Sequence, residues 1–411
     1  LKNNLEAKCL TRKKNKRFAG KERIARGFDL SGDRVGKGFW RKGKQMDLHK
    51  EMLKVMEQKK FLTIYENGNL EEGYTGLVLQ TSDNEILMKN IDFYGNEDGY
   101  CVRRIENIVC YNTGGMDIYR KRQLWEEKKH SHVMENFFVE EENLMTGMLA
   151  YAIKNREPVF AFCEECVYAG WVCGYSDEIV ILNELTPYGE DEGELWLKRE
   201  YIDALETGSP DLQIRKKFWE KEVPKCDGRP EKSFYRKLKK YKGSLQLFEI
   251  YADSDWENCY VGTIEYVTKK ELAIKHIDSE GHYDGYVVLT LEAVMCICQK
   301  SRYLSKIQKN NKCDTTQIKL EMDGENLSDE VLRFAQRKSL PVFLEIGTQG
   351  YYGDIEQWTE EWIQLRAVDL LGNGKGTFWI LREWIDRIWV DNQILREVWQ
   401  MACDKHDLVR I

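Results

Sequence analysis

Apolar residues along the chain follow first a helical period and then the pattern of short strands. Residues 47–58 carry apolar side chains at helical spacing, which predicts an amphipathic helix. Residues 61–65, Phe-Leu-Thr-Ile-Tyr, are β-branched and aromatic and predict a strand, closed by a turn at Asn67-Gly68. Further strand-like runs follow at residues 74–79, 85–89, 99–103 and 108–111. This part of the chain is therefore predicted to be one helix followed by five strands.

The same order of elements is predicted three more times. Helices are expected at residues 143–155, 233–241 and 328–336, the last with Ser328 as its N-cap. Their first strands are expected at residues 158–162, 245–250 and 341–346. A basic and aromatic run after each set of strands predicts a closing helix that packs neighbouring units, at residues 119–125, 214–219, 301–306 and 394–399. The predicted domains are residues 46–126, 141–220, 232–306 and 327–400, joined by short charged linkers.

A stretch of the sequence repeats without gaps across these four domains. It runs over residues 76–108, 170–202, 262–294 and 353–385. Four alignment columns hold one residue type in every copy, and each column steps by 94, 92 and then 91 residues. The columns are Gly76/Gly170/Gly262/Gly353, Gly95/Gly189/Gly281/Gly372, Gly99/Gly193/Gly285/Gly376 and Glu106/Glu200/Glu292/Glu383. A common offset shared by four columns establishes the repeat and predicts one compact β module per copy.

The repeated glycines have a structural interpretation. The second and third columns bracket polar turns between predicted strands three and four, where glycine permits backbone angles that a Cβ opposes, or a bulge. The first column lies where strand two begins and must bend sharply. The alternative, a glycine loop that cradles phosphate, requires glycines leading into a helix. Here they lead into a strand, which favours the structural role.

One helix followed by five short, bent strands resembles the Sm-like and Hfq-like family of small SH3-like β-barrels. The resemblance is clearest at residues 332–344, where a helix enters a first strand, and at Leu197-Lys-Arg-Glu-Tyr-Ile202. It implies a mainly β fold with short helices (α+β): four tandem Sm-like/SH3-like five-stranded barrels, each preceded by a helix. Family members form rings by pairing edge strands, so four units on one chain imply a partial ring, closed or open. One compact β module per copy nevertheless predicts a separate sheet in each unit, and a single continuous sheet would contradict it.

The sequence departs from the family where the family contacts RNA. Where Hfq places a Lys-His pair, each copy has the glutamate column, and a carboxylate repels phosphate. Its expected role is a local cap or a salt bridge. Residues 1–45 have a net charge of +11. Because the whole chain has a net charge of −7, the remaining residues have a net charge of −18. This charge opposes the attraction that nucleic-acid binding needs. RNA is therefore the less favoured partner.

Candidate chemistry is sparse. Cys163-Glu-Glu-Cys166 has half of a zinc spacing, and no second pair follows it. His130-Ser-His132 lies in a charged linker. Asp98, Glu192 and Asp284 share a column, but each belongs to a different unit and the fourth copy has Lys375. We therefore predict no catalytic residues, no metal site, no cofactor and no enzymatic activity.

The N-terminal segment and the composition bear on origin and location. Residues 1–45 are basic, and Met46 is the first methionine, which suggests the hypothesis that this segment is a translated leader; a solvated basic arm is the alternative. The sequence shows no signal peptide and no apolar run of membrane-spanning length. Most cysteines lie in strand-like runs, as expected for reduced core thiols. These features predict a cytoplasmic protein without membrane partners.

The twelve tryptophans give the strongest functional hint. Six lie in the fourth unit: Trp358, Trp362, Trp379, Trp384, Trp389 and Trp399. Most are expected in cores, and a minority on one face would form a surface for docking a protein or for stacking bases.

We predict a binding or scaffold protein whose partner is another protein. RNA binding is the alternative, and sequestering of a small nucleotide between units is a second one.

Overall fold

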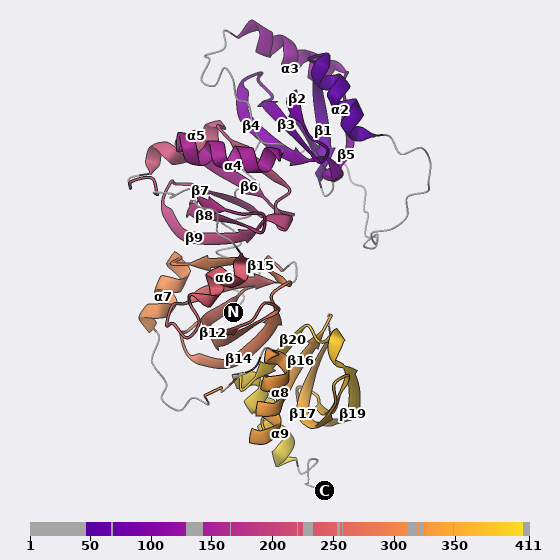
Figure 1. Cartoon of the computed structure of the whole chain (residues 1–411), viewed down its shortest axis with the longest axis vertical. Coiled ribbons are helices and arrows are strands. Elements are labelled where there is room, and N and C mark those ends of the chain that lie inside the picture. The colour runs from indigo at the N-terminus through magenta and orange to yellow at the C-terminus, as the bar shows by residue number, and fades with distance from the viewer. Residues whose placement is uncertain are drawn as a thin grey trace.

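The structure is a computed structural model, and it describes most of residues 47–405. The described range has gaps at residues 67–68, 129–142, 165, 220, 225–232, 253–254, 257, 311–318, 321, 323, 325 and 348. The basic segment 1–45 and the pair His130 and His132 therefore lie outside the described residues. The described residues form eight α-helices and twenty β-strands, so the fold is mainly antiparallel β with helices, as predicted. Four groups of elements follow one another along the long axis (Figure 1).

The order helix, five strands, helix recurs in each group. The first unit consists of α2 (Leu48–Glu57), β1 (Phe61–Glu66), β2 (Asn69–Thr81), β3 (Glu85–Ile91), β4 (Glu97–Arg104), β5 (Ile108–Asn112) and α3 (Met116–Glu127). The second unit consists of α4 (Leu144–Asn155), β6 (Pro158–Phe162), β7 (Val167–Tyr175), β8 (Ile179–Leu185), β9 (Asp191–Lys198), β10 (Ala204–Thr207) and α5 (Pro210–Phe218).

The other two units have the same elements in the same order. The third consists of α6 (Phe234–Lys239), β11 (Phe248–Ala252), β12 (Tyr260–Val267), β13 (Glu271–Ile277), β14 (Tyr283–Thr290), β15 (Val294–Gln299) and α7 (Arg302–Asn310). The fourth consists of α8 (Leu327–Lys338), β16 (Val342–Ile346), β17 (Gln349–Trp358), β18 (Trp362–Val368), β19 (Gly374–Leu381), β20 (Arg387–Val390) and α9 (Gln393–Asp404).

Two local predictions were wrong. The N-cap of α8 is Asn326, whose side chain accepts from the N–H of Asp329 at 2.9 Å. Ser328 lies inside the helix, and its hydroxyl donates to Glu271 of the preceding unit at 2.5 Å. The strand expected from residue 245 begins at Phe248, and Leu245 is 90% exposed. The cap of α8 is thus made two residues earlier than expected, and β11 begins three residues later than expected.

The twenty strands form one continuous, unclosed antiparallel sheet. Within the first unit they pair in the order β5-β1-β2-β3-β4, and the other units repeat this order. Between units, the fourth strand of one pairs with the fifth strand of the next, as β4–β10, β9–β15 and β14–β20. The expectation of a separate sheet in each unit was therefore wrong. The free backbone groups of one unit's edge are satisfied by the next unit's edge.

The three junctions share one register. Arg103 lies opposite Ala204 in the first, Leu197 opposite Cys296 in the second, and Leu289 opposite Arg387 in the third. These pairs occupy equivalent positions of the repeat. A one-residue slip would turn every side chain to the other face of the sheet, so a shared register means a shared arrangement of the units.

The second strand of each unit bends at the same place. A β-bulge interrupts its pairing with the third strand two residues after the first-column glycine, between Val78 and Gln80 in β2, and at equivalent positions of β7, β12 and β17. A bulge bends the strand and increases its twist. The second strand is therefore bent close to the glycine column, as expected. The glycine lies inside the strand and not at its beginning, since β2 already starts at Asn69.

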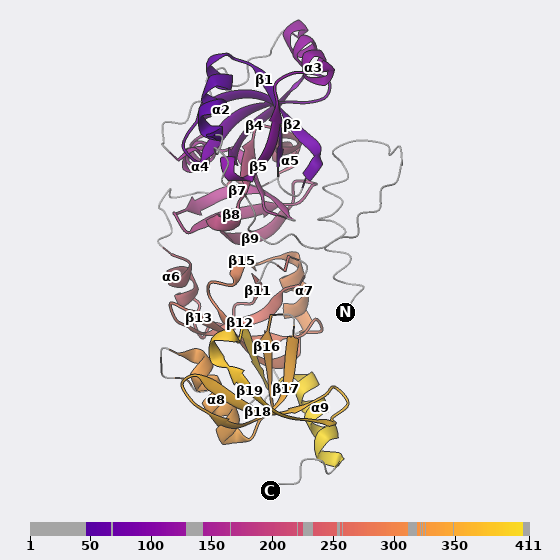
Figure 2. The same cartoon turned by 90° about the vertical axis from the view of Figure 1, so that its right-hand side faces the viewer.

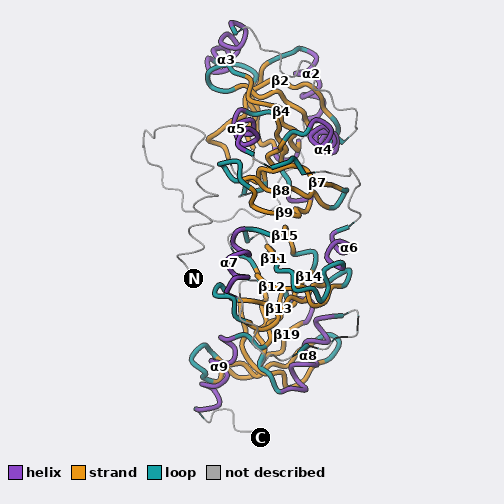
Figure 3. The backbone as a smooth tube through the Cα atoms, turned by 90° about the vertical axis from the view of Figure 1, so that its left-hand side faces the viewer, coloured by secondary structure: helices purple, strands orange, loops and turns teal. Residues whose placement is uncertain are grey.

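The hydrophobic cores lie between units as well as within them. The core under α8, for example, contains Val331 and Leu344 of the fourth unit together with Tyr286 and Val288 of β14. The leading helices α2, α4, α6 and α8 lie along one side of the molecule, and the closing helices α3, α5, α7 and α9 along the other (Figure 2 and Figure 3). Within the described ranges, no helix is both long enough and apolar enough to cross a membrane.

Candidate functional site

The first-column glycines hold two strands at close range. A Cβ added at Gly76 would lie 2.0 Å from the carbonyl oxygen of Lys89, on the neighbouring third strand. At the other three positions, Gly170, Gly262 and Gly353, the corresponding carbonyl oxygens lie 2.6, 2.1 and 2.2 Å away. Only glycine fits such a contact, because any side chain would collide with backbone. This column is structural in all four units.

The second-column glycines form the turn between the third and fourth strands. Gly95, Gly189, Gly281 and Gly372 have positive φ angles of 75°, 74°, 93° and 77°. In each turn a side-chain oxygen caps backbone N–H groups; Asp92, for example, accepts from Tyr94 at 2.8 Å and Asn96 at 2.7 Å. A Cβ at Gly95 would lie 2.6 Å from the Leu124 side chain, and one at Gly372 would lie 2.6 Å from the Ala402 backbone. The turn thus packs directly against the closing helix.

The third-column glycines lie at the junctions. A Cβ at Gly99, Gly193 or Gly285 would lie 2.5, 2.4 or 2.4 Å from a carbonyl oxygen at the end of the next unit's fifth strand. All three have positive φ, as does Gly376, at 91°. No described atom lies within 4 Å of a Cβ placed at Gly376, and among the described strands none pairs with the outer edge of β19. The column therefore marks where one unit receives the next.

The glutamate column lies on the 3-10 turn between the fourth and fifth strands. Glu106 is 3.4 Å from Arg104, and Glu200 is 3.4 Å from Lys198, with the glutamate side chains 72% and 65% exposed. These are the local salt bridges that the sequence suggested. Among the described residues no ion pair is found for Glu292 or Glu383. The exposed pairs contribute little to stability.

The acidic column meets the closing helix of the next unit. The Asp284 carboxylate accepts from the backbone N–H of Gln393, the first residue of α9, at 2.7 Å. Glu192 lies 3.8 Å from Arg302, the first residue of α7. Burial, followed by the nearby Asp92 and Asp211, raises the pKa of Asp98 to about 6. These acids are separated from one another by whole units, so they form no catalytic pair.

The first junction buries a group of charged side chains. Arg103 is fully buried, donates to Glu66 at 2.5 Å, and stacks 3.3 Å from the ring centroid of Tyr74. Glu206, from the fifth strand of the second unit, accepts from Asn90 at 3.5 Å. Burial raises the pKa of Glu206 to about 7. The positions equivalent to Arg103 are Leu197, Leu289 and Ile380, so this charged group is particular to the first junction.

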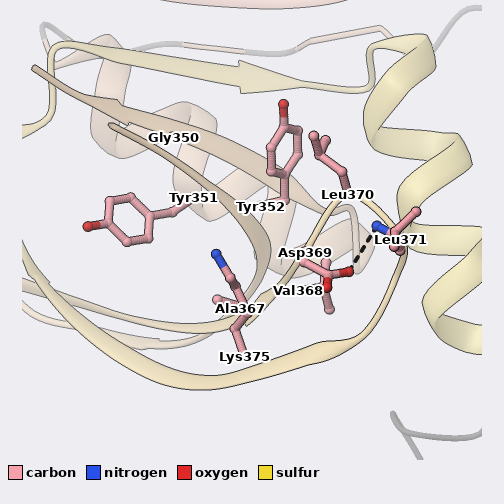
Figure 4. A pocket seen from close by; sticks show the side chains of 9 residues that line it. All are labelled: Gly350, Tyr351, Tyr352, Ala367, Val368, Asp369, Leu370, Leu371 and Lys375. Atoms are coloured by element: carbon pink, nitrogen blue, oxygen red, sulfur yellow. Dashed lines mark hydrogen bonds between the residues drawn. The ribbon is translucent and has the colours of Figure 1, made fainter. Parts of the chain in front are cut away.

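A pocket of about 330 Å³ opens at the C-terminal end of the sheet. Tyr351 and Tyr352 of β17 line it, with Leu371 of the adjoining turn and Lys375 (Figure 4). In the third unit the positions equivalent to Tyr351, Ala367 and Lys375 are Tyr260, His276 and Asp284. The first two pack against Trp389 and the third accepts from Gln393, all across the junction with the fourth unit. The pocket is therefore the place that a following unit occupies elsewhere in the chain.

A second surface, the turn–helix face, is formed by the closing helices and by the turns between the third and fourth strands of the units. The Lys128 ammonium donates to the carbonyl of Tyr94 at 2.7 Å, and the equivalent Lys405 donates to that of Leu371 at 2.7 Å. Its apolar side chains, all 38–76% exposed, are Phe93, Tyr94, Tyr119, Tyr188, Ile214, Phe218, Leu370, Leu371, Ile394 and Met401. Sequence reasoning missed this face. The signal was an apolar pair in an otherwise polar turn, as in Asp92-Phe-Tyr-Gly95 and Asp369-Leu-Leu-Gly372.

The cysteine candidates lie in a tight turn after the first strand of the second unit. Cys163 and Cys166 close a tight turn by reciprocal backbone hydrogen bonds of 2.8 and 3.1 Å, and both side chains are buried. Cys163 follows β6, which ends at Phe162, and lies in the turn. Burial raises the pKa of its thiol. Within the described part of the chain, no three His, Cys, Asp or Glu side chains are grouped as metal ligands.

Comparison with known proteins gives no family assignment. The sequence matches no family model, and no curated protein matches it.

Proposed function

We propose that the chain is a non-enzymatic, cytoplasmic scaffold protein that binds another protein through the turn–helix face. In this proposal the four units are Sm-like, SH3-like barrels in tandem, and they need neither a cofactor nor a metal ion. The exposed apolar side chains of this face belong to the first, second and fourth units, and the closing helices lie along the same side of the molecule. A partner with a repeated or extended apolar segment would then contact several units at once.

The observation that carries the proposal is the exposure of large apolar side chains on that face. Tyr94, Tyr188 and Leu371 occupy the same position of three units and are 51, 76 and 65% exposed. Contiguous apolar patches on a soluble protein mark interaction sites, and aromatic residues are enriched in the hot spots of such sites. Each turn is fixed by its glycine and by its cap, so the side chains are presented on a rigid support.

RNA binding is a second candidate, supported by one observation in the first unit. The Arg120 guanidinium lies 4.6 Å from the ring centroid of Phe93, and Tyr94 and Tyr119 are exposed beside it. The bases of single-stranded nucleic acid stack on aromatic rings and on arginine guanidinium groups. The net charge of −18 outside residues 1–45 opposes this use.

The test is capture of partners from host cells by the full chain, with variants of the face. We expect bound proteins that are lost when Tyr94, Tyr188 and Leu371 are all changed to Ser, and retained by Leu245→Ser. Leu245 is a matched control because it is 90% exposed and precedes β11, so it belongs to neither a turn nor a closing helix of the turn–helix face. Bound RNA that dissociates with added salt would favour the second candidate. Partners that bind the triple variant unchanged would contradict the proposed surface.

A further inference from the structure

The continuous sheet ends in two edges that are complementary to one another. β5 pairs with β1 alone, and β19 pairs with β18 alone, among the described strands. Every other fourth strand of the repeat pairs with a fifth strand of the next unit. The described part of the chain therefore has one unpaired edge of each of the two kinds that join its units.

The edge of β19 exposes a residue that inner units bury. Trp379 is 56% exposed, whereas Val102, Trp196 and Val288 at the equivalent positions are 0, 0 and 2% exposed. Trp196 shows what covers such a side chain, because it packs at 5.6 Å from the ring of Phe248 in the following unit. The fourth unit thus carries a tryptophan where an inner unit buries one against its neighbour.

The same end keeps the other features of a junction. Gly376 has the positive φ of its column, although no described backbone approaches it. The pocket beside it, lined by Tyr351, Tyr352 and Lys375, lies where the inner units receive the next unit. This end of the molecule is therefore shaped as a receiving surface.

The other end of the sheet, at β5 of the first unit, exposes the complementary edge. Val109 and Cys110 of β5 are exposed, whereas Ala204, the equivalent of Cys110, is fully buried in the first junction. Met116, the first residue of α3, is 79% exposed. These side chains occupy the places that contact the preceding unit at an inner junction.

Charge also fits the two ends together. At inner junctions the acidic column faces the first turn of the next closing helix, as Asp284 does with Gln393. In the fourth unit this position is Lys375, and the first turn of α3 contains Asp117, which is 60% exposed. Opposite charges would meet there, as complementarity between partner surfaces requires.

We propose that β19 of one copy of this chain pairs with β5 of a second copy, head to tail, in the register of the inner junctions. In that register Ile380 lies opposite Cys110, Trp379 opposite Tyr111, and Phe378 opposite Asn112 of the neighbouring copy. The inference uses the sheet edges and not the turn–helix face, so it stands or falls independently of the proposed function. Such a heterologous contact produces a closed ring or an open filament.

The register is testable by a disulfide. Arg104 donates its N–H across the first junction to Asp203 at 3.3 Å, and strand N–H groups alternate, so the position of Arg103 and Ala204 is a non-hydrogen-bonded pair. Ile380 and Cys110 are its equivalents. The Cα atoms of such a pair are about 4.5 Å apart, within the range for a disulfide. We expect Ile380→Cys to form a disulfide between copies under mild oxidation, found by mass spectrometry as a link between Cys110 of one copy and the introduced thiol of the other.

Two controls accompany the cross-link. Ile394→Cys places a thiol on α9 at a residue that is 55% exposed and away from the edge, and it should form covalent dimers no faster than the wild type. Ile380→Cys combined with Cys110→Ser should lose the link. Linking of Ile380→Cys at the rate of Ile394→Cys would overturn the proposed register.

A second variant tests the association itself without a cysteine. By the same alternation the N–H of Thr377 points to the free edge, so Thr377→Pro removes an edge donor and leaves the pairing with β18 intact. By analytical ultracentrifugation we expect wild type and Thr377→Ala to form species of at least twice the 48.5 kDa chain mass, and Thr377→Pro to remain a monomer. A constant mass would indicate a ring, and a mass rising with concentration a filament. A wild-type monomer at about 100 μM, or unchanged assembly of Thr377→Pro, would overturn the proposal.

Discussion

β14 and β19 occupy the same position in two units of one chain, but they have opposite surroundings. Tyr286 and Val288 of β14 are buried in the core of the fourth unit, whereas their equivalents in β19, Thr377 and Trp379, are exposed. The backbone conformation is similar, since Gly285 and Gly376 have φ angles of 81° and 91°. The difference shows that a unit's own core covers one face of its fourth strand, and that the neighbouring unit covers the other.

The inner junctions also differ from one another in chemistry while sharing one register. The first places Arg103 and Glu206 in the interface, whereas the third has Leu289 and Trp389 at the same positions. Backbone pairing is common to both, so it fixes the arrangement, and the side chains determine how each junction responds to pH and mutation.

The largest expected effect comes from one substitution made at two equivalent glycines. Gly285→Ala should lower the free energy of unfolding by about 4 to 5 kcal/mol, since it adds backbone strain to a collision with the carbonyl of Val390 at 2.4 Å. Gly376→Ala should cost only the strain, about 1 kcal/mol. Urea unfolding of the two variants beside the wild type measures both values.

Equal losses at the two positions would contradict the comparison between a filled junction and a free end. Gly376→Ala has a second use. If copies associate through β19, this variant should weaken the association more than it weakens the fold, which sedimentation and urea unfolding separate.

The next effect sharpens the contrast between the first junction and the third. Arg103→Leu introduces the residue type that Leu197 and Leu289 supply elsewhere, but it leaves Glu66 without its buried partner. We expect a loss of about 3 to 4 kcal/mol, because an unpaired buried charge is costly. Adding Glu66→Leu should restore most of the loss, since an apolar pair replaces the ion pair. A double variant that is no more stable than Arg103→Leu would contradict this account.

The pH dependence of the first junction is the third prediction. Burial raises the pKa of Glu206 to about 7, so the folded protein holds this proton more tightly than the unfolded chain. The wild type should therefore lose stability as the pH rises from the ordinary value of 4.5 to about 7. Glu206→Gln remains neutral, so it should be more stable than the wild type by at most about 3 kcal/mol at pH 8.

The two proteins should converge near pH 4, where Glu206 is protonated in both states. Thermal unfolding across this pH range tests the sign. A Glu206→Gln variant that is less stable than the wild type at pH 8 would show that the charged carboxylate stabilises the junction.

The smallest effect is expected at the glutamate column. Glu106 is 72% exposed and 3.4 Å from Arg104, so Glu106→Ala should change the free energy of unfolding by less than about 0.5 kcal/mol. A loss above about 2 kcal/mol in urea unfolding would give this column a structural role that the contacts do not show.

Much of the fold could be predicted from the sequence because local periodicity and the glycine columns determine it. The helix expected at residues 47–58 is α2 at Leu48–Glu57, and the strand expected at residues 85–89 is β3 at Glu85–Ile91. The bend in the second strand followed from the physical requirement for glycine. Such features depend on residues close together in the chain, and one sequence contains them.

The junctions and the free ends could not be predicted in the same way. The sheet continues from Arg103 to Ala204 through pairing of residues far apart in the chain, and backbone hydrogen bonds leave no sequence signature of their partner. Trp379 and Trp196 are the same residue type at the same position, one exposed and one buried. Only the presence of a following unit separates them. The turn–helix face was missed because its apolar residues are few and lie in turns that are otherwise polar.

Hydrogen exchange at equivalent backbone amides tests the continuous sheet most directly. The N–H groups of Tyr286 and Val288 point across the third junction, and those of Thr377 and Trp379 point to the free edge, by the alternation seen at Arg104. In dilute protein we predict slow exchange for Tyr286 and Val288 and fast exchange for Thr377 and Trp379, with the second pair becoming protected as copies associate. Exchange of Tyr286 and Val288 as fast as that of Thr377 and Trp379 would contradict the account.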